Sequence, residues 1–117
     1  MLNEDRENYF AIKSWVLETY YDGCRDLAFS KGWNHLEILA YTFHQFENSF
    51  DSLLENFMLL IIQLTLTGSW EYQIKQNLKS QIDNLIKMND VKSLIHLLPE
   101  NEADEFMRDL EILNIQL

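Results

Sequence analysis

Catalytic or metal-binding chemistry would need histidine and carboxylate side chains brought together, and the best candidates lie in FHQFENSFDSLLENF, residues 43–57. On a helix, His44 and Glu47 would be neighbours. Carboxylate-bridged metal bundles use the opposite order, Glu-x-x-His, twice, with further acids from facing helices. This chain has a single pair in reversed order, which favours a solvated or bundle-edge histidine. An enzyme with a carboxylate site built from His44, Glu47, Asp51 and Glu55 is one alternative.

The other reactive groups form no recognisable catalytic set. The single cysteine, Cys24, falls on the apolar side of a predicted helix, where a small buried hydrophobic residue is the usual interpretation. Its neighbours Asp22, Arg25 and Asp26 supply no histidine, and three isolated glycines cannot form a phosphate-binding loop. We therefore expect a protein that is not an enzyme and that takes no metal or cofactor.

Acidic residues form three clusters. Glu18, Asp22 and Asp26 follow one another at intervals of four, as do Glu47, Asp51 and Glu55, and each like-charge pair on a helix costs about 0.2–0.5 kcal/mol. The third cluster occupies the last twenty residues, where the dipole of a predicted helix favours acids in the first turn. A solvated acidic face would explain all three, and a surface for a basic partner is the alternative. The candidate partner-binding residues are Trp15, Glu18, Asp22, Asp26, Glu47, Asp51, Glu55, Glu102, Asp104, Glu105 and Asp109.

Trp15 is included because of its position on a helical wheel. At 100° per residue it falls about 240° from Tyr9, outside the apolar arc and between Asp22 and Asp26. A tryptophan flanked by acids on a solvent face is typical of a binding hot spot. Another helix of the bundle would equally account for it by covering the ring.

The net charge limits the classes of partner. The chain has 19 acidic against 9 basic residues, a formal net charge of −10. Such a field repels nucleic acid and anionic membranes and speeds encounter with a basic protein. The longest apolar run, Phe57 to Leu66, is far shorter than the roughly 20 residues of a membrane span. The lone cysteine and the absence of a basic, apolar leader in MLNEDRENYF predict a cytoplasmic protein.

Hydrophobic periodicity predicts helices throughout. The first, residues 4–29, has an inner face of Tyr9, Ile12, Val16, Tyr20, Cys24 and Leu27, widened by Phe10, Leu17, Tyr21 and Ala28. Gly23 is a possible kink and Gly32 a left-handed cap. Further helices are predicted at 70–88, capped by Ser69, at 91–98, capped by Asn89-Asp90, and at 100–113.

The segment 34–67 carries a heptad seam, a set of apolar residues spaced alternately by three and four. The seam residues are Leu36, Leu39, Phe43, Phe46, Phe50, Leu53, Phe57, Leu60 and Leu64. The unbroken register predicts one helix of about 33 residues. A capping box at Ser52-Leu53-Leu54-Glu55 is the argument for a break. The expected fold is all-α, with a single domain spanning residues 1–117 and about five helices, one of them long and central.

In overall character the chain resembles the bacterial immunity proteins that neutralise toxins of contact-dependent growth inhibition systems and nuclease colicins. The resemblance lies in the small, acidic, helical domain with aromatic residues among its acids. It implies tight binding to a cognate basic toxin, a nuclease by expectation, through coverage of the active site. The alternative is a helical adaptor or regulator that pairs with a second copy or with another helix through its heptad seam.

Overall fold

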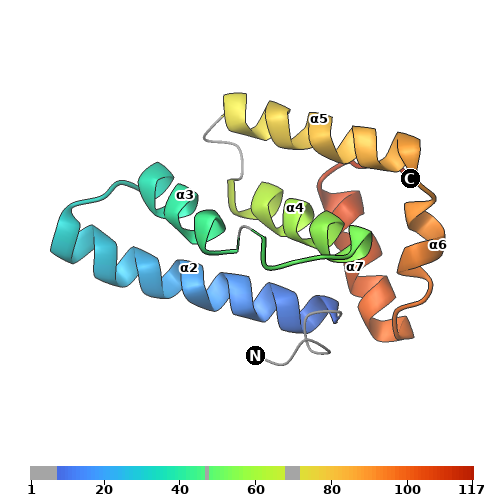
Figure 1. Ribbon diagram of the computed structural model, residues 1–117, viewed down its shortest axis with the longest axis horizontal. Helices are drawn as coiled ribbons and strands as arrows, with labels where there is room; N and C mark the ends of the chain where they lie inside the picture. Colours follow the sequence, from blue (N-terminus) through green and yellow to red (C-terminus); the bar gives the residue numbers. More distant parts are fainter. Residues whose placement is uncertain (1–7, 47, 68–71) are drawn as a thin grey trace.

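A computed structural model describes residues 8–46, 48–67 and 72–117 of the chain. These residues form a single all-α domain without strands, as predicted (Figure 1). The helices are α2 (Tyr9–Lys31), α3 (His35–Gln45), α4 (Leu53–Thr67), α5 (Tyr72–Met88), α6 (Val91–Ile95) and α7 (Glu100–Ile112). Within the described part of the chain, no helix combines the length and apolarity needed to cross a bilayer.

Helix α2 forms the long lower edge of the molecule in the view of Figure 1 and has well-defined ends. The Asn8 side chain accepts a hydrogen bond from the Ala11 amide at 2.9 Å, which caps the first turn. At the other end Gly32 takes the predicted left-handed conformation, with φ of 66°. The helix runs through Gly23 without interruption. The predicted start near residue 4 is wrong, because Asn8 has an extended backbone, with φ of −98° and ψ of 124°, and the helix begins at Tyr9.

The predicted long helix over residues 34–67 is wrong, because the chain breaks between α3 and α4. Asn48 adopts a positive φ of 64°, a left-handed conformation that ends helical geometry and that asparagine tolerates better than most residues. Helix α4 then starts at the capping box. The Ser52 hydroxyl accepts from the Glu55 amide at 3.0 Å, and a Glu55 carboxylate oxygen accepts from the Ser52 amide at 3.2 Å. The bundle therefore has six described helices instead of about five.

The heptad seam survives the break because its residues still face inward. Phe46 and Phe50 lie in the connection, and their rings stack with centroids 6.0 Å apart. Leu39, Phe46, Phe50, Phe57 and Leu64 are buried, and the other four seam residues are half-buried. A seam of this spacing thus identified the core residues without requiring a continuous helix.

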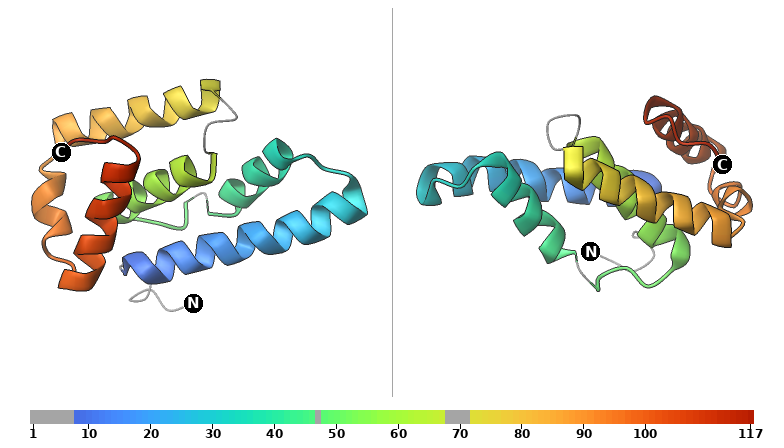
Figure 2. Two further views of the ribbon diagram at one scale, coloured as in Figure 1. Left: turned by 180° about the vertical axis from the view of Figure 1, so that it is seen from behind. Right: turned by 90° about the horizontal axis from the view of Figure 1, so that it is seen from above.

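The main core surrounds α4. Phe57, Met58, Ile61 and Leu64 are fully buried there, and Phe106 of α7 stacks on Phe57 with ring centroids 5.6 Å apart. Helix α5 packs along α4, while α6 and α7 close the end of the bundle, where α7 runs across the beginning of α2 (Figure 2). The Asp90 side chain caps α6 as predicted, although α6 ends at Ile95. The predicted cap at Ser69 lies outside the described residues.

The second half of α2 pairs with α3 to form an arm at one end of the 44 Å long molecule (Figure 1). A small separate apolar cluster holds the arm together, made of buried Tyr20, Ile38 and Leu39. Cys24 and Leu27 pack beside it. Because this cluster is small and one-sided, the opposite face of α2 is left to solvent.

Candidate protein-binding surface

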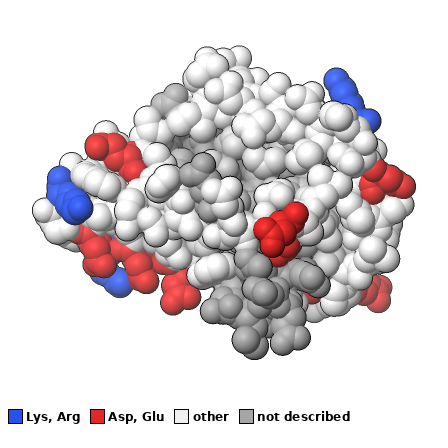
Figure 3. Space-filling model, viewed as in Figure 1, with Lys and Arg blue, Asp and Glu red and all other residues white. Residues whose placement is uncertain are grey.

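The first acidic cluster lies along the solvent face of the arm. Glu18, Asp22 and Asp26 are all exposed, as the four-residue spacing on an amphipathic helix predicts. Red carboxylates line the edge of the molecule over α2 (Figure 3). The three acids therefore share one continuous, solvated strip of helix.

Arg25 moderates the charge of this strip. Its guanidinium lies 2.6 Å from an Asp22 oxygen and 3.7 Å from an Asp26 oxygen. Both pairs are mostly exposed, so each contributes little to stability. Three carboxylates against one guanidinium still leave a local negative excess. The arrangement offers an acidic surface whose internal ion pairs can be exchanged for those of a partner.

Two exposed aromatic residues accompany the acids. Tyr21 is 61% exposed and Phe29 is 89% exposed. The prediction that Phe10, Tyr21 and Ala28 widen the apolar face of the first helix is wrong, because all three are exposed, whereas Leu17 is half-buried. Tyr21 and Ala28 lie in the arm. The arm is thin, so its apolar cluster covers a narrower arc of α2 than the main core does. Sequence reasoning missed this aromatic surface; the only available signal was the position of Phe29 near the end of the helix.

A groove of about 280 Å³ runs between α2 and α3 beside these acids. Its lining residues are Thr19, Asp22, Gly23, Asp26, Leu27 and Tyr41. Gly23 brings the two helices close, since a Cβ built there would meet Ile38 of α3 at 3.5 Å. We call Glu18, Tyr21, Asp22, Asp26 and Phe29 the α2 surface. With the adjoining groove, it combines negative charge, aromatic rings and concavity.

Trp15 is not part of this surface. The ring is half-buried and packs edge-on against two phenylalanines, Phe46 at 4.9 Å and Phe50 at 6.1 Å between centroids. The helical wheel placed it outside the apolar arc of α2, but the connection between α3 and α4 covers it. The Trp15 ring therefore packs against the connection that interrupts the predicted long helix. The prediction that Trp15 is an exposed hot spot is wrong.

The second acidic cluster does not exist as a stack along one helix. Asp51 is exposed in the connection before α4, and Glu55 is 6% exposed because its carboxylate is used in the capping box. Glu47 lies outside the described residues. His44 is exposed near the end of α3. Among the described residues, no three histidine, cysteine or acidic side chains come close enough to hold a metal ion.

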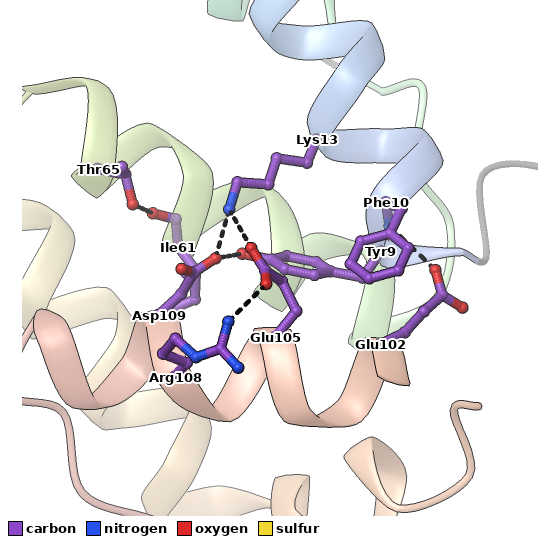
Figure 4. A network of polar contacts seen from close by, with 9 residues as sticks. All are labelled: Tyr9, Phe10, Lys13, Ile61, Thr65, Glu102, Glu105, Arg108 and Asp109. Atoms are coloured by element: carbon purple, nitrogen blue, oxygen red, sulfur yellow. Dashed lines mark hydrogen bonds and ion pairs between the residues drawn. The ribbon is translucent and has the colours of Figure 1, made fainter. Parts of the chain in front are cut away.

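The third cluster is divided between structural contacts and solvent. Glu105 and Asp109 face Lys13 of α2, with Nζ 3.3 Å from Glu105 Oε1 and 2.7 Å from Asp109 Oδ2 (Figure 4). Tyr9 donates its phenolic proton to the same Asp109 oxygen at 2.5 Å. Asp104 is exposed. Only Asp104 of these three is therefore available to a partner without breaking a contact between α2 and α7.

Glu102 is the most deeply buried of the described acids, at 2% exposure. Its Oε1 accepts a 3.1 Å hydrogen bond from the Phe10 amide, so it satisfies a free N–H at the start of α2 (Figure 4). The other oxygen, Oε2, is buried without a hydrogen-bond donor among the described residues. A buried acceptor left unpaired costs roughly 1–3 kcal/mol, more for a charged group. The expectation that Glu102 belongs to an exposed acidic face is wrong, since the side chain lies inside the molecule.

Burial and charge set the protonation of the Tyr9 and Lys13 network. Burial raises the pKa of Tyr9 well above its ordinary value, and the hydrogen bond and negative charge of Asp109 add to this. Burial alone would lower the pKa of Lys13, but the hydrogen bonds and charges of Asp109 and Glu105 outweigh it, and the pKa is raised. The network is thus a fixed link between helices.

Comparisons of the chain with protein-family models, with curated proteins and with solved structures gave no match. The functional argument therefore depends on the surface chemistry of the molecule itself.

Proposed function

We propose that this chain is an acidic immunity protein that binds a cognate basic toxin, a nuclease by class, and neutralises it by covering the active site. The α2 surface makes the contact. The observation that supports this proposal best is the exposure of Glu18, Asp22 and Asp26 on one helix beside Tyr21 and Phe29. In this proposal the chain acts by binding and carries out no catalysis.

The chemistry of the α2 surface suits such a partner. A nuclease cleft must be positive to hold a polyanion, and a negative helix that enters it gains both attraction and speed of encounter. Exposed aromatic rings supply the apolar contact area that binding hot spots need. Phe29, at 89% exposure, has the most area to lose to a partner. We expect charge to set the association rate and the rings to set the dissociation rate.

The test begins with identification of the partner in the organism that encodes the chain. The protein is immobilised, and a captured basic protein is purified and assayed for nuclease activity with and without the immunity protein. Stoichiometric loss of nuclease activity supports the proposal. A captured protein that has no nuclease activity, or whose activity is unaffected by binding, contradicts it.

A matched pair of variants then tests the surface. The triple variant Glu18→Gln, Asp22→Asn, Asp26→Asn removes three charges from the α2 surface. The control Asp83→Asn, Glu100→Gln, Glu111→Gln removes three exposed charges from α5 and α7. Because the net charge changes equally, long-range attraction changes equally in both. We expect the α2 variant to associate about tenfold more slowly than the control at low salt. Equal rates would contradict the assignment of the surface.

Salt dependence gives an independent measurement. The association rate of the unmodified protein should fall steeply as salt rises from about 50 to 500 mM, because the Debye length shortens to a few ångströms. The α2 variant should show a shallower fall. An association rate that does not change with salt would contradict electrostatic steering by the α2 surface.

The alternative function, an adaptor that pairs through the heptad seam, would need those residues at the surface. In this fold the seam packs within the chain, and none of its nine residues is exposed. No observation on the described residues favours it. A concentration-dependent dimer in sedimentation that disappears on substitution of a seam residue would support it over the proposed function.

A further inference from the structure

Three helices begin around a second cleft, at the opposite end of α2 from the aromatic part of the α2 surface. Its volume is about 440 Å³, and it is lined by Asn8, Ser52, Leu54, Glu55, Leu97, Leu98, Pro99 and Glu102. Asn8 and Ser52 cap α2 and α4, and Pro99 precedes α7. We call this the N-terminal cleft. It shares no residue with the α2 surface.

Glu102 has one carboxylate oxygen without a hydrogen-bond donor among the described residues. The side chain is 2% exposed, one of its oxygens is committed to the Phe10 amide, and the other has no donor among the described residues. A carboxylate oxygen is an acceptor, so the missing group must be an N–H or O–H donor. Glu102 lines the cleft, and its buried Oε2 has capacity for one more hydrogen bond.

The charge of the lining indicates a cationic donor. Glu55 is the second buried carboxylate of the cleft, and no lysine, arginine or histidine lines it among the residues that the structure describes. The partial positive charges of the helix starts are already opposed by Asn8, the capping box and the Glu102 bond to Phe10. Two carboxyl groups and no basic side chain among the described lining residues therefore face the cleft, which disfavours an anion and favours a cation.

The walls of the cleft indicate the shape of the ligand. Leu54, Leu97, Leu98 and Pro99 supply apolar surface, and Leu97 is 80% exposed at the edge of the cleft. A methylene stem suits such a wall while a polar tip reaches the carboxylates. A guanidinium has five donors in a planar fork and can bond two carboxylates from different helices, which a compact ammonium does less well.

We propose that the N-terminal cleft binds an arginine side chain of a protein partner, with the guanidinium on Glu102 and Glu55 and the stem against Leu97 and Leu98. Because it uses other residues, this site stands whether or not the α2 surface binds a toxin.

The test uses small probes on the free protein. Nα-acetyl-arginine N-methylamide is titrated while backbone amide NMR signals are followed, and the citrulline analogue is the matched neutral probe of nearly the same shape. We expect saturable shifts of the Phe10, Ser52 and Glu102 amides with the arginine probe, and binding at least about tenfold weaker with citrulline. Equal binding of the two probes, or the absence of saturable shifts at these amides, would overturn the proposal.

Variants test the carboxylates themselves. Glu102→Gln keeps an oxygen for the Phe10 amide and removes the charge, and Glu55→Gln keeps the capping box, which accepts glutamine equally. Asp104→Asn is the control, because it removes one exposed charge from the same helix. We expect arginine-probe binding to weaken about tenfold in each glutamine variant and to stay unchanged in Asp104→Asn. If Glu102→Gln fails to fold, binding of the arginine probe to Glu55→Gln is the test of the site. Unchanged binding in a folded glutamine variant would overturn the site.

Discussion

Lys13 Nζ lies 2.7 Å from Asp109 Oδ2, and this ion pair between α2 and α7 joins two residues that are 96 positions apart in the chain. The lysine also contacts Glu105, and Tyr9 bonds to the same aspartate oxygen. The pair therefore fixes the first turns of α2 against α7, the same region in which Glu102 bonds to the Phe10 amide. Three groups of α2 and three acidic side chains of α7 therefore act together at this junction.

Replacement of Lys13 by methionine should lower the free energy of unfolding by about 1–3 kcal/mol, since it removes the cation that faces partly buried Asp109 and leaves Glu105 paired with Arg108 alone. Urea unfolding of the variant and the parent protein measures this. Arg108→Met is the control, because Arg108 pairs with the same Glu105 but is 65% exposed. Its effect should stay within about 0.5 kcal/mol. Equal losses in the two variants would contradict a special role for the Lys13 link.

The raised pKa values of Tyr9 and Lys13 predict a loss of stability at alkaline pH. Both groups hold their protons more tightly in the folded state. Their contribution is therefore complete below the unfolded pKa of about 10 and is lost as pH rises above it, by about 1.4 kcal/mol per pH unit for each proton. Urea midpoints between about pH 8 and 11 measure the slope. Tyr9→Phe should flatten it, and a Tyr9→Phe profile parallel to that of the parent protein would refute this origin.

The capping box predicts different effects for two adjacent polar residues. Ser52→Ala should cost about 0.5–2 kcal/mol of unfolding free energy, because the Glu55 amide loses its acceptor at the start of α4. Asp51→Ala removes an exposed charge outside the helix and should have little effect. Thermal unfolding of both variants makes the comparison. Equal destabilisation would show that α4 does not depend on this cap.

Trp15 should stabilise the fold without contributing to partner binding. Trp15→Ala removes the ring that Phe46 and Phe50 contact, and we expect a loss of about 2–4 kcal/mol. Tyr21→Ala, six residues later on the exposed face, should change stability by less than about 0.5 kcal/mol. Affinity for the proposed toxin should follow the reverse order: Tyr21→Ala should bind it more weakly than the parent protein does, and folded Trp15→Ala should bind it equally well. A Trp15→Ala protein of unchanged stability would contradict the observed packing.

The two described glycines should respond to alanine in opposite directions. At Gly23 a Cβ would make ordinary contacts, 3.5 Å from Ile38 and 3.9 Å from Thr42, and alanine favours the helix by about 0.5–1 kcal/mol. At Gly32 nothing lies within 4 Å, but φ is 66°, a conformation that costs alanine about 1–2 kcal/mol. Differential scanning calorimetry should therefore show a higher melting temperature for Gly23→Ala and a lower one for Gly32→Ala. A destabilised Gly23→Ala would mean that α2 and α3 pack more tightly than these distances allow.

The sequence by itself determined the helical class and most of the core. Apolar spacing of three and four identified Tyr9, Ile12, Val16 and Tyr20 as the inner face of α2, because helical period alone decides which residues share a side. The same rule identified every seam residue. Local signals were also sufficient for Gly32, Asp90 and the capping box, whose hydrogen bonds lie within one turn.

Only the tertiary structure decided which polar and aromatic residues are exposed. Trp15 and Glu102 are covered by segments distant in sequence, the connection after α3 in one case and the start of α2 in the other. Tyr21 is exposed because the arm has only two helices. The heptad register also failed to reveal the break at Asn48, since a connection that keeps Phe46 and Phe50 inward preserves the spacing. Periodicity reports which side chains face the core, whereas long-range packing determines what covers the rest.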